Sequence, residues 1–191
     1  MAANNSIVIL SNKSAKSNIS GAVVSFNATT NQMISSDTGA VNFGTLSEND
    51  RIVISGSASN DGTYTVSEVV TAGVVTLVED VIVEAEGATI TIAPSGILGA
   101  NYKGDGFYGY TDGLHTVSYT LNNFIGDIKI QATLSSTPES TDWFDVLGTS
   151  VSYGSAETST KAYNFTGNFV WVRVMVESFT GGSISSIYYN Y

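Results

Sequence analysis

The chain is divided into many short segments in which apolar and polar residues alternate, and this pattern most limits the folds it can adopt. In residues 50–55, for example, Ile52 and Ile54 share one face of such a segment. Alternation with a period of two is typical of a β strand with one buried face. No long window repeats apolar residues at the spacing of a helix. The sequence therefore predicts an all-β protein.

The alternating segments fall into two groups. Residues 21–94 hold about six candidate strands, which predicts a small β-barrel or an open β-sandwich, with Asn60 and Asp61 in left-handed conformations at a tight hairpin. Residues 114–191 hold about seven, which is typical of an antiparallel jelly-roll-like β-sandwich. These strands are expected at residues 115–121, 125–134, 143–147, 150–154, 161–166, 168–177 and 183–191. Between them, residues 95–113 are expected to be a Gly- and Tyr-rich linker. Residues 1–20 are expected to be an extended N-terminal arm, or else a frayed terminus.

Charge limits the partners of the chain. Acidic residues outnumber basic ones by 17 to 7, which gives a formal net charge of −10. The basic residues are scattered singly, whereas binding to phosphates or to an anionic membrane needs clustered cations. No stretch approaches the ~20 apolar residues of a membrane span. We therefore expect no nucleic acid partner and no membrane insertion. The amino-terminal segment does not resemble a secretory signal, so synthesis in a cytoplasm is expected.

Few residues of the sequence are suited to catalysis or metal binding. Without cysteine, thiol chemistry is excluded. His115 is the single histidine, for which we expect a structural or surface role, and one histidine cannot supply a usual zinc site. The pairs Glu79 with Asp80 and Glu84 with Glu86 suggest a solvated strand edge, with a glycosidase or depolymerase as the alternative. The sequence thus predicts a protein that is not an enzyme, with no catalytic, cofactor-binding or metal-binding residues.

Calcium is a more plausible metal than zinc for this sequence. Residues 59–62, 103–106 and 111–113 supply the oxygen ligands that calcium takes, but not the spacing of an EF-hand loop. Hairpin turns explain these three segments equally well.

Tyrosines near the carboxyl end form a candidate interface. Alternation places Tyr189 and Tyr191 on one face and Tyr188 on the other. A strand with aromatic side chains on both faces must bury one face against something else, and a neighbouring subunit is the natural candidate. Tyr108 and Tyr110, in the expected linker, complete the set. The alternative is an aromatic platform on which sugars stack, as in carbohydrate-binding sandwiches.

Two parts of the sequence resemble modules of tailed-bacteriophage virion proteins, particularly those of marine and cyanobacterial phages. Residues 50–92, which include DRIVISGSASNDGTYTVSEVV and VVTLVEDVIVEAEGATITI, resemble a small β domain of phage structural and tail proteins. Residues 113–146 and 165–191, which include GLHTVSYTLNNFIGDIKIQATL and FTGNFVWVRVMVESFTGGSISSIYYNY, resemble a sandwich of fibre-like or particle-associated proteins.

The resemblance implies a virion structural protein of the tail, baseplate or fibre region, or a capsid decoration protein. It carries over no catalytic residue, because such modules are scaffolds. Its expected partners are other virion proteins and further copies of the same chain, assembled as a homo-oligomer in a particle made in the host cytoplasm. A carbohydrate-binding module that recognises host-surface glycans is the alternative from a different class.

Overall fold

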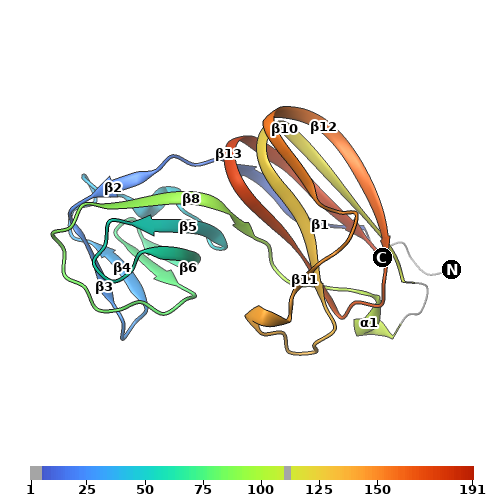
Figure 1. Cartoon of the computed structure of the whole chain (residues 1–191), viewed down its shortest axis with the longest axis horizontal. Helices are drawn as coiled ribbons and strands as arrows, with labels where there is room; N and C mark the ends of the chain where they lie inside the picture. Colours follow the sequence, from blue (N-terminus) through green and yellow to red (C-terminus); the bar gives the residue numbers. More distant parts are fainter. Residues whose placement is uncertain (1–5, 110–112) are drawn as a thin grey trace. The chain divides into compact units, whose positions relative to one another are not determined.

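The computed structural model describes residues 6–109 and 113–191 (Figure 1). The described chain is all-β, as the alternation predicted, and its strands pair antiparallel. The strands are β1 (Ser6–Ser14), β2 (Ile19–Gly21), β3 (Val24–Asn27), β4 (Gln32–Ser35), β5 (Asp50–Ser55), β6 (Gly62–Thr71), β7 (Val74–Leu77), β8 (Ile90–Leu98), β9 (Tyr102–Lys103), β10 (Leu114–Thr133), β11 (Phe144–Asp145), β12 (Val151–Thr166) and β13 (Trp171–Asn190). Helix α1 spans Asp105–Tyr108, and 3-10 turns span Phe43–Thr45 and Ser140–Asp142.

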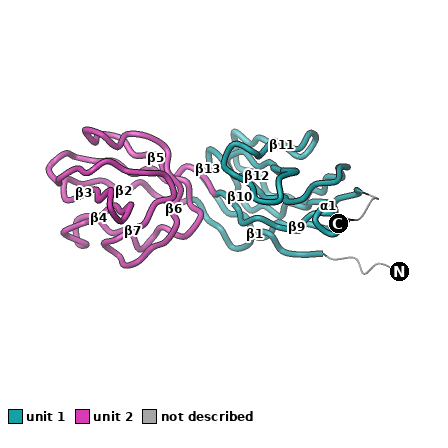
Figure 2. The backbone as a smooth tube through the Cα atoms, turned by 90° about the horizontal axis from the view of Figure 1, so that it is seen from below, with its two compact units in different colours: residues 1–15, 98–191 teal, residues 16–97 magenta. Residues whose placement is uncertain are grey.

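The chain forms two compact units (Figure 2). Unit 1 comprises Met1–Ala15 and Leu98–Tyr191, and unit 2 comprises Lys16–Ile97. These bounds differ from the expected 1–20, 21–94, 95–113 and 114–191. Strand β1 pairs with β13, with Ile7 opposite Tyr189, so the segment expected as an arm contributes a strand to unit 1. Strands β8 and β9 and helix α1 occupy about half of the expected linker.

Unit 1 is built on three long strands. The sheet runs in the order β12, β10, β13 and β1, with β11 paired to one end of β10 and β9 to one end of β13. Strand β13 lies between β10 and β1 in this sheet. Val172, Val174 and Val176 on one of its faces are buried, whereas Trp171, Arg173 and Met175 on the other face are only partly buried. The strands β10, β12 and β13 arch together in Figure 1.

Positive backbone φ values mark the bends of these strands. Asn123 and Gly126 in β10 have φ of 49° and 150°, and Ser178 and Gly182 in β13 have φ of 51° and 68°. The pairing register shifts at the same places. A Cβ on Gly182 would lie 2.0 Å from the carbonyl oxygen of Asn123, so the two bends also touch. Residues read from sequence as turns between separate strands are therefore bends within single strands.

The core of unit 1 consists of aliphatic and aromatic residues from the concave side of these strands. Among the fully buried side chains are Val117, Tyr119, Ile130 and Val174. The Tyr119 hydroxyl donates a hydrogen bond of 2.8 Å to the carbonyl oxygen of Thr149, which satisfies its one polar atom.

Unit 2 pairs its strands in the order β2, β8, β5, β6, β7, β4 and β3 around a separate core that includes Phe26, Phe43 and Ile52. The expected hairpin joins β5 to β6, but Asn60 and Asp61 are not left-handed; Gly56, with φ of 89°, is. Asn60 is instead fully buried, and its side chain makes hydrogen bonds to the backbone of Ile82 in another loop.

Candidate functional site

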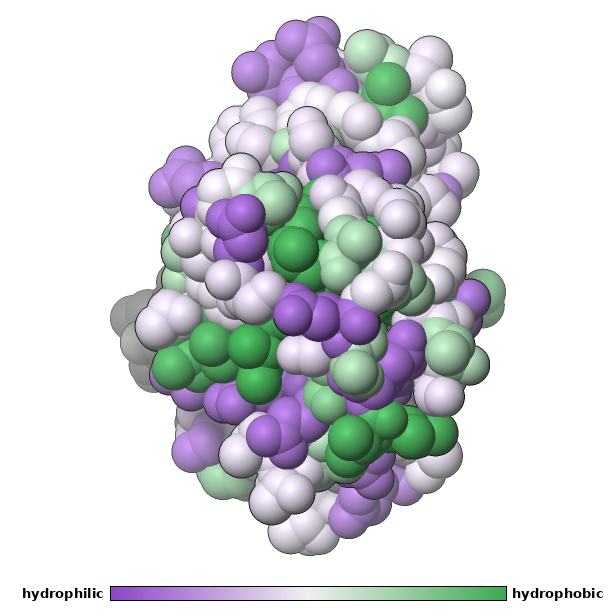
Figure 3. Space-filling view, turned by 90° about the vertical axis from the view of Figure 1, so that its left-hand side faces the viewer, coloured by the Kyte–Doolittle hydropathy of each residue, from purple (hydrophilic) through white to green (hydrophobic). Residues whose placement is uncertain are grey.

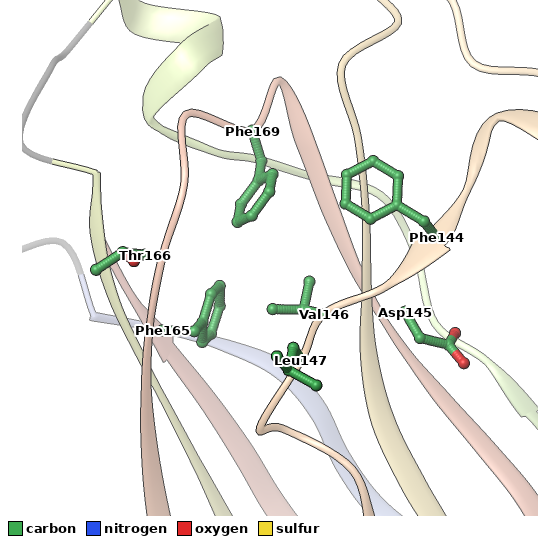
Figure 4. A pocket seen from close by; sticks show the side chains of 7 residues that line it. All are labelled: Phe144, Asp145, Val146, Leu147, Phe165, Thr166 and Phe169. Atoms are coloured by element: carbon green, nitrogen blue, oxygen red, sulfur yellow. The ribbon is translucent and has the colours of Figure 1, made fainter.

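A pocket of about 440 Å³ in unit 1 is the candidate site (Figure 4). Its apolar lining is Phe144, Val146, Leu147, Phe165 and Phe169. Asp145 and Thr166 complete the lining, and Figure 4 shows the Asp145 carboxylate directed away from the aromatic rings. The pocket is a mainly apolar hollow that is partly open to solvent.

The bend of β10 brings the walls of the pocket together. Phe144 on β11 lies opposite Ala132, near the carboxyl end of β10. Phe165 on β12 lies opposite His115, at the amino end of the same strand. Phe169 joins the two walls, since its ring centroid lies 5.9 Å from that of Phe144 and 6.1 Å from that of Phe165.

Leu147 projects from the rim on a tight loop. Its side chain is 95% exposed, although Val146 beside it is buried. The Val146 backbone N–H donates to the carbonyl oxygen of Ile130 at 2.8 Å, and the Thr149 hydroxyl donates to the carbonyl oxygen of Val146 at 2.8 Å. Gly148 turns the chain with φ of 82°. The loop is thus held by buried hydrogen bonds while it presents a large apolar side chain to solvent.

His115 supports the pocket from behind. Its ring is fully buried and stacks on Phe165, with centroids 5.0 Å apart and planes at 22°. Its Nε2 lies 2.7 Å from the Gly167 carbonyl oxygen, which can only accept, so this nitrogen carries a proton. In a neutral ring, Nδ1 then accepts from the Tyr189 hydroxyl at 2.8 Å. A structural or surface role was expected for this histidine. Its burial rules out a surface position, and these contacts are those of a residue that fixes the packing around it.

Asp105 on α1 completes the buried polar cluster. Its carboxylate is 3.9 Å from Nε2 of His115, and both side chains are inaccessible to solvent. Burial, with a smaller contribution from the negative charge of Asp105, raises the pKa of Tyr189 above its ordinary value. Tyr189 therefore stays protonated and available as a donor.

The Asp145 carboxylate at the rim is tied to the sheet. It accepts from Gln131 at 2.9 Å and pairs with Lys129 at 3.1 Å. Burial alone would raise the pKa of Asp145, but these two partners outweigh it, and its pKa lies below the ordinary value. Asp145 is thus a fixed negative charge beside the pocket.

The tyrosines of the candidate interface are separated by the structure. Tyr189 is fully buried within unit 1, so it has no surface to offer to another subunit. Tyr188 is 44% exposed on the opposite face of β13. Tyr191 stacks on Tyr108, with centroids 5.8 Å apart and planes at 7°. Tyr110 lies outside the described residues, as does part of the 111–113 segment considered for calcium.

The acidic pairs Glu79 with Asp80 and Glu84 with Glu86 lie in unit 2, where the carboxylates of Glu79 and Glu84 accept hydrogen bonds from backbone N–H groups. Glu79 accepts from the Thr65 N–H, and Glu84 accepts from the N–H groups of Ala58 and Ser59. Within residues 6–109 and 113–191, no group of three or more His, Asp and Glu side chains could hold a metal ion. In the same residues, no helix has the length and apolar composition to cross a membrane.

No family model, curated protein or solved structure matches this chain.

Proposed function

We propose that the protein is a non-enzymatic structural component of a bacteriophage virion that acts through protein–protein contacts, including contacts between identical copies. The observation that carries the assembly part is the juxtaposition of an exposed leucine and an apolar pocket on one rim of unit 1. Leu147 is the knob, and the hollow beside it is lined by Phe144, Phe165 and Phe169. A knob and a hollow on the same surface allow two copies to exchange leucines about a two-fold axis.

The energetics favour such a contact. Full burial of a leucine side chain contributes about 1.5–3 kcal/mol, and the half-exposed ring of Phe144 would be covered in the same step. The Leu147 loop is already ordered by the Val146 and Thr149 hydrogen bonds, so little conformational entropy would be lost.

The virion assignment is supported by the sequence resemblance of residues 50–92, 113–146 and 165–191 to phage structural modules. We include in the proposal the finer fold description, a small barrel or sandwich in unit 2 and a jelly-roll-like sandwich in unit 1. Tail, baseplate, fibre and capsid surface are all compatible with this function.

The test replaces Leu147, and the control replaces an exposed leucine elsewhere in unit 1. Leu147→Ser is expected to weaken self-association at least tenfold in sedimentation equilibrium, which corresponds to about 1.4 kcal/mol. Leu134→Ser also removes an exposed leucine, but one that does not line the pocket, and it should leave association unchanged. Equal association of the two variants would contradict the pocket as the contact.

A carbohydrate-binding function is the second candidate, and the stacked pair of Tyr108 and Tyr191 favours it. Tyr108 is 44% exposed, so one aromatic ring in a fixed orientation is accessible to a sugar. A glycan screen followed by tyrosine and tryptophan fluorescence titration tests this. Binding that is lost in Tyr108→Ala but kept in Tyr188→Ala would support it, and a screen without hits would count against it.

A further inference from the structure

A loop of unit 2, residues 78–84, presents exposed aliphatic side chains on an ordered backbone. It follows β7 and precedes β8. Val81 is buried in the core of unit 2, whereas Val78, Ile82 and Val83 are 61%, 60% and 70% exposed. Three exposed aliphatic side chains within six residues need an explanation when the backbone that carries them is held in place.

Two asparagine side chains tie the backbone of this loop. Asn31 donates to the carbonyl oxygens of Leu77 and Glu79 at 2.9 Å each, and its own oxygen accepts from the Val81 N–H at 2.9 Å. Asn60 accepts from the Ile82 N–H at 2.8 Å and donates to the Ile82 carbonyl oxygen at 3.0 Å. Both carbonyl and N–H groups of the loop are therefore satisfied by side chains from neighbouring segments.

Glu84 fixes the end of the loop. Its carboxylate accepts from the N–H groups of Ala58 and Ser59, at 2.8 and 3.1 Å, and from the Asn60 amide at 2.9 Å. Its backbone exchanges two hydrogen bonds with Phe26. The hydrogen bond from Ala58, with further bonds from Asn60 and Ser59, lowers the pKa of Glu84. The exposed side chains thus sit on a loop that is ordered before any partner arrives.

The surroundings of the loop are acidic. Between Arg51 and Lys103 the sequence holds no lysine or arginine. The acidic residues in that stretch are Asp61, Glu68, Glu79, Asp80, Glu84 and Glu86. Unit 2 as a whole has nine acidic and two basic residues, a formal charge of −7 out of −10 for the chain. Figure 3 shows hydrophobic patches among hydrophilic side chains on the displayed face.

From the ordered backbone, the aliphatic side chains and the charge, we propose that residues 78–84 are a docking surface for a protein partner whose contact site is an apolar face flanked by lysine or arginine. Ile82 and Val83 pack against the apolar face, and the surrounding carboxylates meet the basic residues beside it. Preorganisation reduces the entropy lost on binding, and charge complementarity raises the association rate and selects against acidic partners. The inference goes beyond the self-association proposed for unit 1, and none of its residues belongs to the pocket.

The test uses three synthetic amphipathic helical peptides of equal length with the full chain. One combines Lys and Leu, the second Glu and Leu, and the third Lys and Ser. Isothermal titration calorimetry is expected to give an affinity for the Lys/Leu peptide at least tenfold higher than for either other peptide. Backbone amide shifts in NMR spectra should change mainly in residues 78–84.

Variants locate the contact. The double variant Ile82→Ser/Val83→Ser should lower the affinity for the Lys/Leu peptide at least tenfold. Val70→Ser, which removes an exposed valine of β6, is the matched control and should bind as the unmodified chain does. Equal binding of the double variant, equal binding of the Lys/Ser peptide, absence of binding, or shift changes centred elsewhere would each overturn the proposal. Self-association is measured on the same variants and should not change. Failure of this proposal can therefore be distinguished from failure of the self-association proposed for unit 1.

Discussion

The hydroxyl oxygen of Tyr189 lies 2.8 Å from Nδ1 of His115, and both side chains are fully buried. His115 is the residue through which a catalytic triad would have to pass, and Tyr189 was expected at a subunit interface. Their contact places both inside unit 1, where their rings pack against Phe165 and Phe169, which line the pocket. The positions of the aromatic side chains that line the pocket thus depend on buried polar groups.

Removal of the Tyr189 hydroxyl should destabilise unit 1. In Tyr189→Phe, Nδ1 of His115 loses its buried partner, which costs about 1–3 kcal/mol of the free energy of unfolding. Urea denaturation followed by circular dichroism measures this loss. Tyr188→Phe, on the exposed neighbour, is expected to change stability by less than about 0.5 kcal/mol. Equal stability of the two variants would show that the hydrogen bond contributes nothing.

Stability should fall at alkaline pH because of two buried tyrosines. Burial is the largest cause that raises the pKa of Tyr119 and of Tyr189 above the ordinary value of 10.0. Above about pH 10 the unfolded chain loses these protons while the folded chain keeps them, so the stability that both groups contribute below pH 10 is progressively lost. Unfolding free energies from pH 8 to pH 12 should decline less steeply in Tyr119→Phe/Tyr189→Phe than in the unmodified chain. Parallel curves would contradict this origin.

The bend of β13 should tolerate no side chain at Gly182. Its φ of 68° disfavours other residues, and a Cβ there would meet the Asn123 carbonyl oxygen at 2.0 Å. Gly182→Ala should therefore lower the free energy of unfolding by about 2 kcal/mol or more. Gly154→Ala in β12 is the control, because no atom lies within 4 Å of its added Cβ. Similar melting temperatures of the two variants would argue against a strained bend.

The strands were predictable from alternation, whereas the bends were not. Residues 115–121 and 125–134 were expected as separate strands, because asparagine and glycine between them are also typical of turns. In a hairpin the two segments pair with each other, but here both pair with β12 and β13 as parts of β10. Local sequence does not distinguish these cases, since the difference lies in partners distant along the chain.

The pocket was missed for the same reason. Phe144 and Phe165 lie in segments that were read as strands, and nothing near them in sequence indicates that they meet. They converge because they flank opposite ends of the bent β10. Tyr189 was assigned to the correct strand but to a surface, because alternation shows which residues share a face and not what covers that face.

The Glu84 carboxylate should stabilise unit 2 only where it is ionised. Its pKa lies below the ordinary value of 4.5, so the stability it contributes is present above that pH and is lost as the pH falls through its folded pKa. Unfolding measured from pH 7 to pH 3 should depend less on pH in Glu84→Gln. In hydrogen exchange at pH 7, the amides of Ala58 and Ser59 should lose protection in this variant. Unchanged protection would contradict the role of the carboxylate in ordering the loop.

Assembly through the pocket rim is the central claim, and the absolute molar mass of the unmodified chain tests it most directly. Light scattering across a concentration series is expected to give a defined multiple of the 20.0 kDa chain mass, reached as concentration rises. The Leu147→Ser variant should need a higher concentration to reach the same mass. A mass of 20.0 kDa at every concentration would contradict self-association as the basis of function.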